Sequence, residues 1–280
     1  MRTSFFSRQF LWALILSLIA AGSIAQDKPA EKFEPEVGQQ GKDVIWVPTP
    51  QPLVDRMLNL AKLTPKDYLI DLGSGDGRTV ITAAKRGTRA LGVEYNPKMV
   101  ALSRRLAGEA GVGDKAQFVN GDIFETDFSA ATVITLFLLP DLNIKLRPKI
   151  LDMKPGTRVV SNSFTMEAWQ ADETAKASRE EGCENYCTAY LWIVPAKVGG
   201  IWRVDDGEIT LKQDFQMISG SLRSGGKTTA ITGGRLRGDE IRFNAGGTVY
   251  TGRVHGDTIE GTASIGGRTR AWKARRSFRS

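Results

Sequence analysis

The 280-residue sequence predicts an α/β domain with a doubly wound, mostly parallel sheet, followed by a small antiparallel β domain. Between residues 67 and 164, short runs rich in Val, Ile and Leu alternate with amphipathic segments, a pattern typical of parallel strands joined by helices. After residue 198 the pattern changes to short alternating strands separated by glycine turns, which is typical of an antiparallel sheet.

Composition changes at the same place. Residues 26–197 carry 22 basic and 23 acidic side chains, whereas residues 198–280 carry 14 and 8. Of the 30 glycines, 16 fall in residues 199–280. We therefore expect a first domain over residues 44–197 and a basic, Gly-rich β domain over residues 198–280.

The N-terminus has the pattern of an export signal. Arg2 and Arg8 precede an uncharged apolar run, and small residues stand before Gln26, as in a secretory signal peptide over residues 1–25. The run is shorter than the roughly 20 residues that a membrane-spanning helix needs. We expect a periplasmic or secreted protein, with an uncleaved membrane anchor as the alternative, and a polar tether over residues 26–43.

Export to an oxidising compartment affects the expected state of the two cysteines. In an oxidising compartment, Cys183 and Cys187 can close a small structural disulfide loop, and two unpaired thiols are the alternative. Two thiolates and one distant histidine, His255, cannot complete a four-ligand zinc site, so we expect no metal.

The elements of the first domain follow in order. Strands are expected at residues 67–73, 89–95, 115–122, 131–140 and 158–164, and helices at residues 78–87, 96–111 and 141–156. Gly87, Gly111 and Gly156 stand where a left-handed residue ends a helix.

The turn after the first strand reads DLGSGDGR. A dinucleotide fingerprint requires a third glycine at position 78, but that residue is Arg78 and the third glycine is Gly77. Asp71 ends the strand directly before the turn. Because a carboxylate repels a diphosphate but accepts hydrogen bonds from an ammonium group, the expected ligand has a cationic amino-acid end and no phosphates.

Two further acids end the next two strands. Glu94 stands where such sheets bind both ribose hydroxyls, and Asp122 can accept from an adenine amino group while Ile123 packs on the ring. Any one of these acids alone is more often an ordinary strand-end or cap residue. Three in succession predict an adenosine with an amino-acid tail, which is S-adenosylmethionine.

These motifs resemble a known family. DLGSGDGR, GVEYNP and GDIF resemble the class I S-adenosylmethionine-dependent methyltransferases, which have a Rossmann-like sheet. VPTPQPLVDRML and LFLLPDLNIKLRPKI are similar to the lineage of the ATP synthase c-subunit lysine methyltransferases, and the resemblance covers roughly residues 44–195. The resemblance implies a cofactor site with Asp71, Gly73 and Gly75 at the methionine end, Glu94 at the ribose, and Asp122 and Ile123 at the adenine. It also implies that the VPTP segment, with Thr49, folds over the cofactor before a helix begins at Gln51.

The exit of the fourth strand is where such folds present groups to the methyl acceptor. Asp141 and Asn143 are therefore the catalytic candidates for orienting or deprotonating it. The alternative is that Asp141 merely stabilises a helix N-terminus. No histidine lies in the first domain, which excludes a Ser-His-Asp hydrolase there.

The second domain contains the same sequence pattern twice, GRLRGDEIRF and GRVHGDTIEG, and each copy predicts a strand, a Gly-Asp turn and a second strand. About eight short strands are expected, curled into a small barrel or strongly bent sheet. The expected core aromatics are Trp202, Phe215, Phe243, Tyr250 and Trp272, and His255 is expected to be a turn residue.

The signal-peptide pattern predicts export, and the resemblance implies a methyltransferase with a protein lysine as acceptor, although the lysine-modifying members of that family are intracellular. A small-molecule acceptor is one alternative, and a non-catalytic protein that binds the cell envelope through its β domain is another. Six basic residues and no acid lie in residues 268–279, which favours an anionic membrane or envelope surface, or is simply a solvated basic edge. No nucleic-acid module is recognisable, so no nucleic-acid partner is expected.

Overall fold

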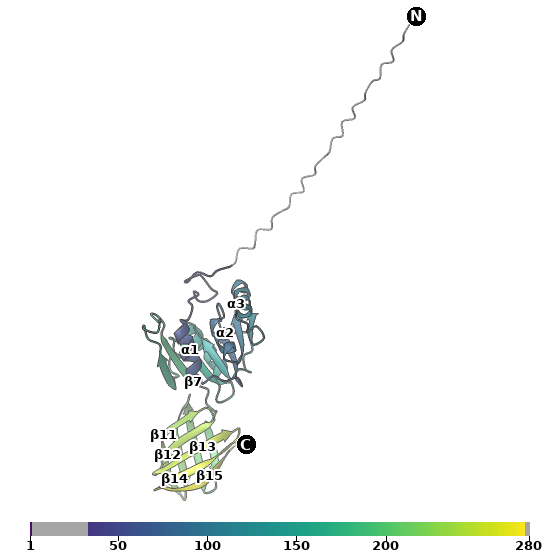
Figure 1. The fold of residues 1–280 in the computed structure, drawn as a ribbon. Helices are drawn as coiled ribbons and strands as arrows, with labels where there is room; N and C mark the ends of the chain where they lie inside the picture. The colour runs from purple at the N-terminus through teal and green to yellow at the C-terminus, as the bar shows by residue number, and fades with distance from the viewer. Residues whose placement is uncertain (2–32, 278–280) are drawn as a thin grey trace. The chain divides into compact units, whose positions relative to one another are not determined.

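The computed structural model describes Met1 and residues 33–277 (Figure 1). The expected signal peptide, apart from Met1, and the first part of the expected tether lie outside the described residues. From Glu34 onward the chain forms one contacting unit that contains a mixed sheet and a β barrel.

The first domain is built on a seven-stranded sheet of order β3-β2-β1-β4-β5-β7-β6. Its strands are β1 (Tyr68–Leu72), β2 (Arg89–Glu94), β3 (Ala116–Asn120), β4 (Val133–Leu136), β5 (Arg158–Asn162), β6 (Glu173–Lys176) and β7 (Thr188–Ile193). The first five strands pair in parallel, and β7 pairs antiparallel with both β5 and β6. The prediction of a doubly wound, mostly parallel sheet is confirmed.

Four helices accompany this sheet: α1 (Gln51–Leu60), α2 (Arg78–Lys85), α3 (Pro97–Glu109) and α4 (Pro140–Leu151). Helix α1 begins at Gln51 as expected, since Pro50 fixes an extended backbone directly before it. Gly87 and Gly111 have positive φ directly after the C-caps of α2 and α3, which confirms these two helix ends. The expectation for Gly156 is wrong: α4 ends at Leu151, and Gly156, also with positive φ, lies in a separate turn after Pro155, which cannot continue the helix.

The strand order reverses between β1 and β4. Strand β1 continues through β2 to β3 on one side, whereas β4 leads to β5 and β7 on the other. In open α/β sheets this switch point opens a crevice at the carboxyl ends of the strands, where ligands bind. Every residue of β4 is buried, so the sheet is a rigid support for that crevice.

The second domain is a closed antiparallel barrel of eight strands, β10-β11-β12-β13-β14-β15-β8-β9. Its strands are β8 (Gly200–Val204), β9 (Gly207–Asp214), β10 (Met217–Ser224), β11 (Lys227–Arg237), β12 (Glu240–Ala245), β13 (Thr248–His255), β14 (Thr258–Ile265) and β15 (Arg268–Arg276). The two Gly-Asp turns connect β11 to β12 and β13 to β14, and His255 lies at the exposed end of β13.

The barrel core is aromatic, with one correction. Trp202, Phe243, Tyr250 and Trp272 are buried as expected. Phe215 is not part of this core: its ring stacks on Trp169 of the first domain at 6.0 Å between centroids. The reason is that Phe215 lies in the tight turn between β9 and β10, with a φ of 50°, and not on an inward-facing strand position.

The described end of the expected tether is folded. Gly38 N–H donates to the Trp46 carbonyl at 2.8 Å, and Trp46 N–H donates to the Gln39 carbonyl at 2.9 Å. Gln40 and Ile45 form an antiparallel bridge between them. Residues 38–46 are therefore a small hairpin, and contacts with distant residues, described below, hold it against the sheet. No helix among the described residues is long and apolar enough to cross a membrane.

Candidate active site

A cavity of about 230 Å³ opens at the carboxyl ends of the strands. All seven residues predicted to bind the cofactor line it: Thr49, Asp71, Gly73, Gly75, Glu94, Asp122 and Ile123. The two catalytic candidates, Asp141 and Asn143, are not among the residues that line it. The cavity is also lined by the hairpin of residues 38–46 and by residues that follow β4 and β5.

The glycine turn takes a backbone path that side chains rarely allow. Gly73, Gly75 and Gly77 all have positive φ, at 82°, 54° and 80°. A Cβ at Gly75 would lie 2.7 Å from the Trp46 indole nitrogen, and one at Gly77 would lie 2.6 Å from the Phe118 ring. The first two glycines thus let the backbone line the cavity, whereas Gly77 lets α2 pack closely against β3.

Asp71 is a buried carboxylate at the centre of the cavity. It is 7% exposed, and its single hydrogen-bond partner among the described residues is the Thr135 hydroxyl, at 2.6 Å. Burial raises the pKa of Asp71 to about 7, with smaller contributions from the charges of Glu94 and Asp76, while the Thr135 bond opposes the rise. A buried carboxylate with no cation beside it is a ready acceptor for a ligand ammonium group.

Glu94 already holds two backbone groups. One carboxylate oxygen accepts from Gly75 N–H at 2.9 Å and the other from Asn96 N–H at 2.8 Å. Glu94 therefore braces the glycine turn and the start of α3 at once. Each oxygen keeps a further lone pair, so the carboxylate can still accept from two ribose hydroxyls.

Asp122 is tied to the hairpin. One oxygen accepts from Phe124 N–H at 2.8 Å and the other from the Lys42 ammonium group. The Lys42 bond, followed by the Phe124 bond, lowers the pKa of Asp122. Lys42 also lies over the Tyr95 ring, 4.7 Å from its centroid. These contacts close residues 38–46 over the adenine end of the predicted site.

Thr49 joins two sides of the cavity. Its hydroxyl accepts from Asn162 of β5 at 3.2 Å, and its carbonyl accepts from Arg78 of α2 at 2.8 Å. Arg78 is held in turn by Asp76. The VPTP segment is thus fixed by contacts across the cavity as well as by its prolines, in agreement with a segment folded over a ligand.

The structure does not bring Asp141 and Asn143 to the cavity. Asp141 is exposed in the first turn of α4, where a carboxylate stabilises the helix N-terminus. Asn143 is fully buried, and its amide nitrogen lies 3.4 Å and 3.3 Å from the carbonyl oxygens of Phe164 and Thr165. This geometry supports the structural alternative for Asp141 and a loop-holding role for Asn143.

Sequence reasoning missed an aromatic part of the cavity. Trp46, Phe137, Phe164 and Tyr186 line it and come from four separate segments. Phe137 lies inside LFLLP and Tyr186 lies between the two cysteines, but neither ring was expected to line the site. No local spacing connects the four rings, because the fold brings them together from distant parts of the chain.

The residues present fit S-adenosylmethionine. Asp71 would accept from the ammonium group, Glu94 from the ribose, and Asp122 with Ile123 would meet the adenine. Within the described part of the chain, Asp71 is buried and accepts from Thr135 alone, with no cation paired to it. The cavity therefore has an uncompensated carboxylate at the predicted methionine end. Among the described residues, no group of three or more His, Cys, Asp or Glu could hold a metal.

Comparison with known proteins agrees with this site. The model of the ANTKMT methyltransferase domain family matches residues 71–173. A protein-lysine N-methyltransferase of Saccharolobus islandicus is 44% identical over 154 residues, which cover 54% of this chain and 94% of the relative. The mouse ATP synthase c-subunit lysine N-methyltransferase is 39% identical over 107 residues, 38% of this chain and 43% of the relative. The chain therefore spans nearly all of the archaeal relative but less than half of the mouse one.

A solved structure leads to the same fold. A crystal structure of an RNA methyltransferase from Salinibacter ruber, in complex with S-adenosylhomocysteine, is 49% identical with a TM-score of 0.50. The match covers 54% of this chain and 96% of that one. The match therefore leaves nearly half of this chain outside the shared fold.

A sheet with this strand order, a glycine turn and three strand-end acids around one cavity define an S-adenosylmethionine-dependent methyltransferase. The close relatives narrow this class. The chain belongs to the methyltransferase family that includes the archaeal protein-lysine N-methyltransferase and the ATP synthase c-subunit lysine methyltransferases, with an added C-terminal β barrel.

Proposed function

We propose that this methyltransferase N-methylates a protein lysine and does so after export from the cytosol. The observation that carries the acceptor is the 44% identity to a protein-lysine N-methyltransferase that the chain covers almost completely. The cavity agrees with it, because its rim at β4, β5 and β7 is apolar and aromatic and suits a long alkyl chain.

S-adenosylmethionine supplies an activated methyl group and its own leaving group. The residues of this chain would hold the cofactor and exclude water from the reacting atoms. Asp71 would fix the amino-acid end, and Glu94 would fix the ribose while bracing the glycine turn. The acceptor amine must arrive neutral, because only a free lone pair on nitrogen can attack the methyl carbon.

The test is methyl transfer from labelled S-adenosylmethionine by the chain from Gln26 onward to lysine-containing peptides and a protein mixture. Hydrolysis and amino-acid analysis should then find labelled methyl-lysine. Asp71→Asn, assayed at an S-adenosylmethionine concentration that saturates only the wild type, serves as the control with weakened cofactor binding, and Asp114→Asn, at an exposed position, serves as the matched active control. Label found only in a small molecule would overturn the protein acceptor.

RNA is the second candidate acceptor because the Salinibacter protein is described as an RNA methyltransferase. Charge argues against it: residues 26–197 carry 22 basic and 23 acidic side chains, so this domain has no net positive charge to attract phosphates. Adding RNA to the same assay separates the two. Label in nuclease-sensitive material and none in methyl-lysine would select RNA.

Export is supported by two features. The N-terminal sequence has a signal-peptide pattern, and Cys183 and Cys187 form a disulfide, which persists in oxidising compartments. Exported material should begin near Gln26 on N-terminal sequencing, and both cysteines should resist alkylation until they are reduced. An intact Met1 on a soluble cytosolic product would contradict export.

The barrel offers a basic surface for an anionic partner. Lys273 and Arg276 pair with Glu260 and Asp257 of the barrel itself, whereas Arg268, Arg270 and Arg275 are exposed on β15. We expect the chain to sediment with phosphatidylglycerol vesicles at low salt and to release them as salt rises. Equal sedimentation with neutral vesicles would contradict this role.

A further inference from the structure

Three aromatic side chains line one side of the cavity and contact one another. Phe137 follows β4, Phe164 follows β5, and Tyr186 precedes β7. Their ring centroids are 6.1 Å apart for Phe137 and Phe164, 5.3 Å for Phe137 and Tyr186, and 6.0 Å for Phe164 and Tyr186. The rings therefore form a continuous wall and not an open cage. We call these three residues the aromatic wall.

The wall is only partly buried. Phe137 and Phe164 are half-buried, and Tyr186 is 45% exposed. Rings that served only the hydrophobic core would be covered, as Trp169 and Trp192 are in the same domain, both at 0% exposure. An exposed group of rings at a cavity mouth marks a surface that a ligand covers.

The backbone that presents the wall is strained at two places. Ser163, directly before Phe164, has a φ of 58°, and Tyr186 itself has a φ of 56°. Non-glycine residues rarely adopt this left-handed conformation, which persists only where surrounding contacts enforce it and which gathers at functional sites. Here the contacts include the hydrogen bond from Ser163 N–H to the Thr188 carbonyl, at 2.6 Å.

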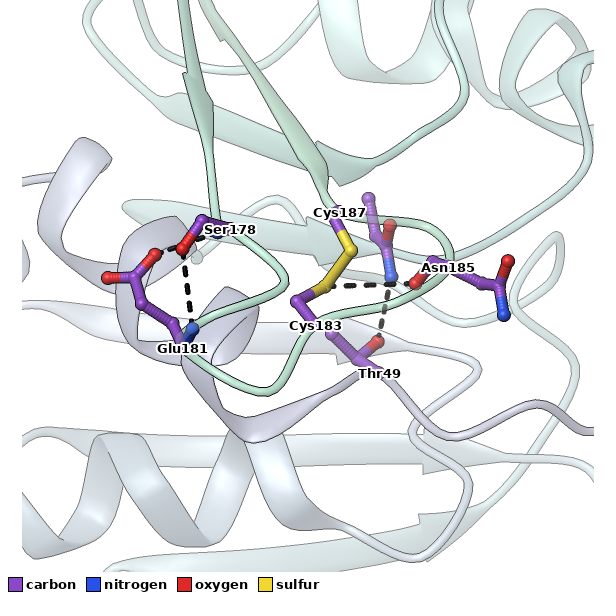
Figure 2. The surroundings of a disulfide bond; sticks show 7 residues. Thr49, Ser178, Glu181, Cys183, Asn185 and Cys187 are labelled. Carbon is purple, nitrogen blue, oxygen red and sulfur yellow. Dashed lines mark hydrogen bonds between the residues drawn. A yellow bond between two sulfur atoms is a disulfide. The ribbon is translucent and has the colours of Figure 1, made fainter.

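A disulfide holds the Tyr186 end of the wall. Figure 2 shows the bridge between Cys183 and Cys187, which closes a short loop that contains Tyr186. Cys183 is 2% exposed and belongs to the core cluster that includes Leu53 and Val54 of α1. The bridge therefore anchors the loop in the core while Tyr186 remains at the cavity.

The wall and the cofactor residues lie on different sides of the strand switch point. Asp71, Glu94 and Asp122 belong to the ends of β1, β2 and β3, whereas the wall belongs to β4, β5 and β7. The acids that line the cavity are Asp43, Asp71, Asp76, Glu94 and Asp122, and none of them comes from the segments of the wall. A cation bound on the side of β4, β5 and β7 would therefore contact the ring faces of the aromatic wall, and the segments that carry the wall contribute no carboxylate to the cavity.

We propose that the aromatic wall is the acceptor subsite, which binds the alkyl stem and the nitrogen of the substrate lysine. This assignment rests on the proposed function. In the reaction the nitrogen lone pair forms a bond to the methyl carbon as the carbon–sulfur bond breaks, and that electron pair remains on sulfur. The nitrogen gains positive charge and later loses a proton to water. Ring faces stabilise such a charge, so the wall favours the transition state and the methylated product.

The test compares two peptides on the chain loaded with S-adenosylhomocysteine. One carries trimethyllysine, and the other carries its neutral isostere, with carbon in place of the quaternary nitrogen. We expect calorimetry to show about fivefold tighter binding of the cation. Tyr186→Ala should remove that preference, Tyr186→Phe should retain it, and S-adenosylhomocysteine affinity should be the same in all three proteins.

Equal binding of the two peptides to the wild type would overturn the proposal, as would an unchanged preference in a folded Tyr186→Ala variant. The Michaelis constant for a lysine peptide gives a second measure, and Tyr186→Ala should raise it about fivefold. If the wild type makes no methyl-lysine, the proposed function is wrong. If the wild type makes methyl-lysine and Tyr186→Ala has the same Michaelis constant for the peptide, only the assignment of the aromatic wall as acceptor subsite is wrong.

Discussion

The two sides of the cavity are built in different ways. The cofactor side, at the ends of β1, β2 and β3, consists of glycines and carboxylates that hydrogen-bond to nearby backbone, as Glu94 does to Gly75 and Asn96. The aromatic wall consists of rings on a strained backbone that a disulfide anchors. The difference indicates that one side recognises a fixed polar molecule by directed bonds, while the other accepts an alkyl chain by shape and ring contact.

The largest expected effect is on the cofactor side. Asp71→Asn removes a charge-assisted hydrogen bond to the cofactor ammonium group, so S-adenosylmethionine affinity should fall roughly tenfold to hundredfold. Calorimetry measures this loss, with Asp114→Asn as the control. The Michaelis constant for a lysine peptide should change little. A larger change in this constant than in cofactor affinity would contradict the claim that the cofactor side and the aromatic wall bind different ligands.

Asp71 also gives a pH dependence. Its pKa is raised to about 7, and the cofactor requires the carboxylate, so wild-type affinity should rise with pH up to about 7 and then level off. Because the folded-state pKa exceeds the unfolded one, this group lowers stability as pH rises from about 4 to about 7. Thermal unfolding of the cofactor-free chain at pH 8 should therefore show a higher Tm for Asp71→Asn than for the wild type.

Glu94→Ala should weaken S-adenosylhomocysteine binding about tenfold or more. From the sequence, a strand-end carboxylate facing an open cleft should support little of the fold. The structure changes that expectation, since Glu94 accepts from two backbone N–H groups, and the variant should also have a lower Tm. Glu109→Ala, on the exposed face of α3, is the control. Unchanged affinity in a folded Glu94→Ala variant would remove Glu94 from the site.

Removing the disulfide tests the role of the aromatic wall. The double variant Cys183→Ser, Cys187→Ser should lose about 2 kcal/mol of unfolding free energy and should raise the Michaelis constant for a lysine peptide about fivefold, because Tyr186 loses its anchor. Its S-adenosylhomocysteine affinity should equal that of the wild type. A loss of cofactor affinity in this variant would show that the two sides are not independent.

The smallest effect is expected at the hairpin. Lys42→Ala removes a partly exposed ion pair with Asp122 and should weaken cofactor binding about twofold to threefold at low salt, with less effect at high salt. Lys66→Ala, at an exposed position away from the cavity, should have no effect. An effect of Lys42→Ala that does not depend on salt would point to packing of the hairpin and not to charge.

The acids and glycines of the cofactor side could be predicted because each of them stands at the end of a strand, within a short local motif. Asp71 and the glycines occupy one turn, and Glu94 and Asp122 each close a parallel strand, so strand order alone brings them to one edge. The catalytic candidates could not be settled this way. Asp141 and Asn143 stand two residues apart on α4, but helix geometry exposes one and buries the other.

The sequence by itself determined the α/β sheet, the glycine turn, the acids of the cofactor side, the paired cysteines and the antiparallel β domain. Each depends on local periodicity, on turn chemistry or on spacing within one motif. The tertiary structure decided the aromatic wall, the hairpin over Asp122 and the place of Phe215. These depend on pairings between distant segments: β7 runs antiparallel beside β5, which places Tyr186 next to Phe164, and no local pattern records that register.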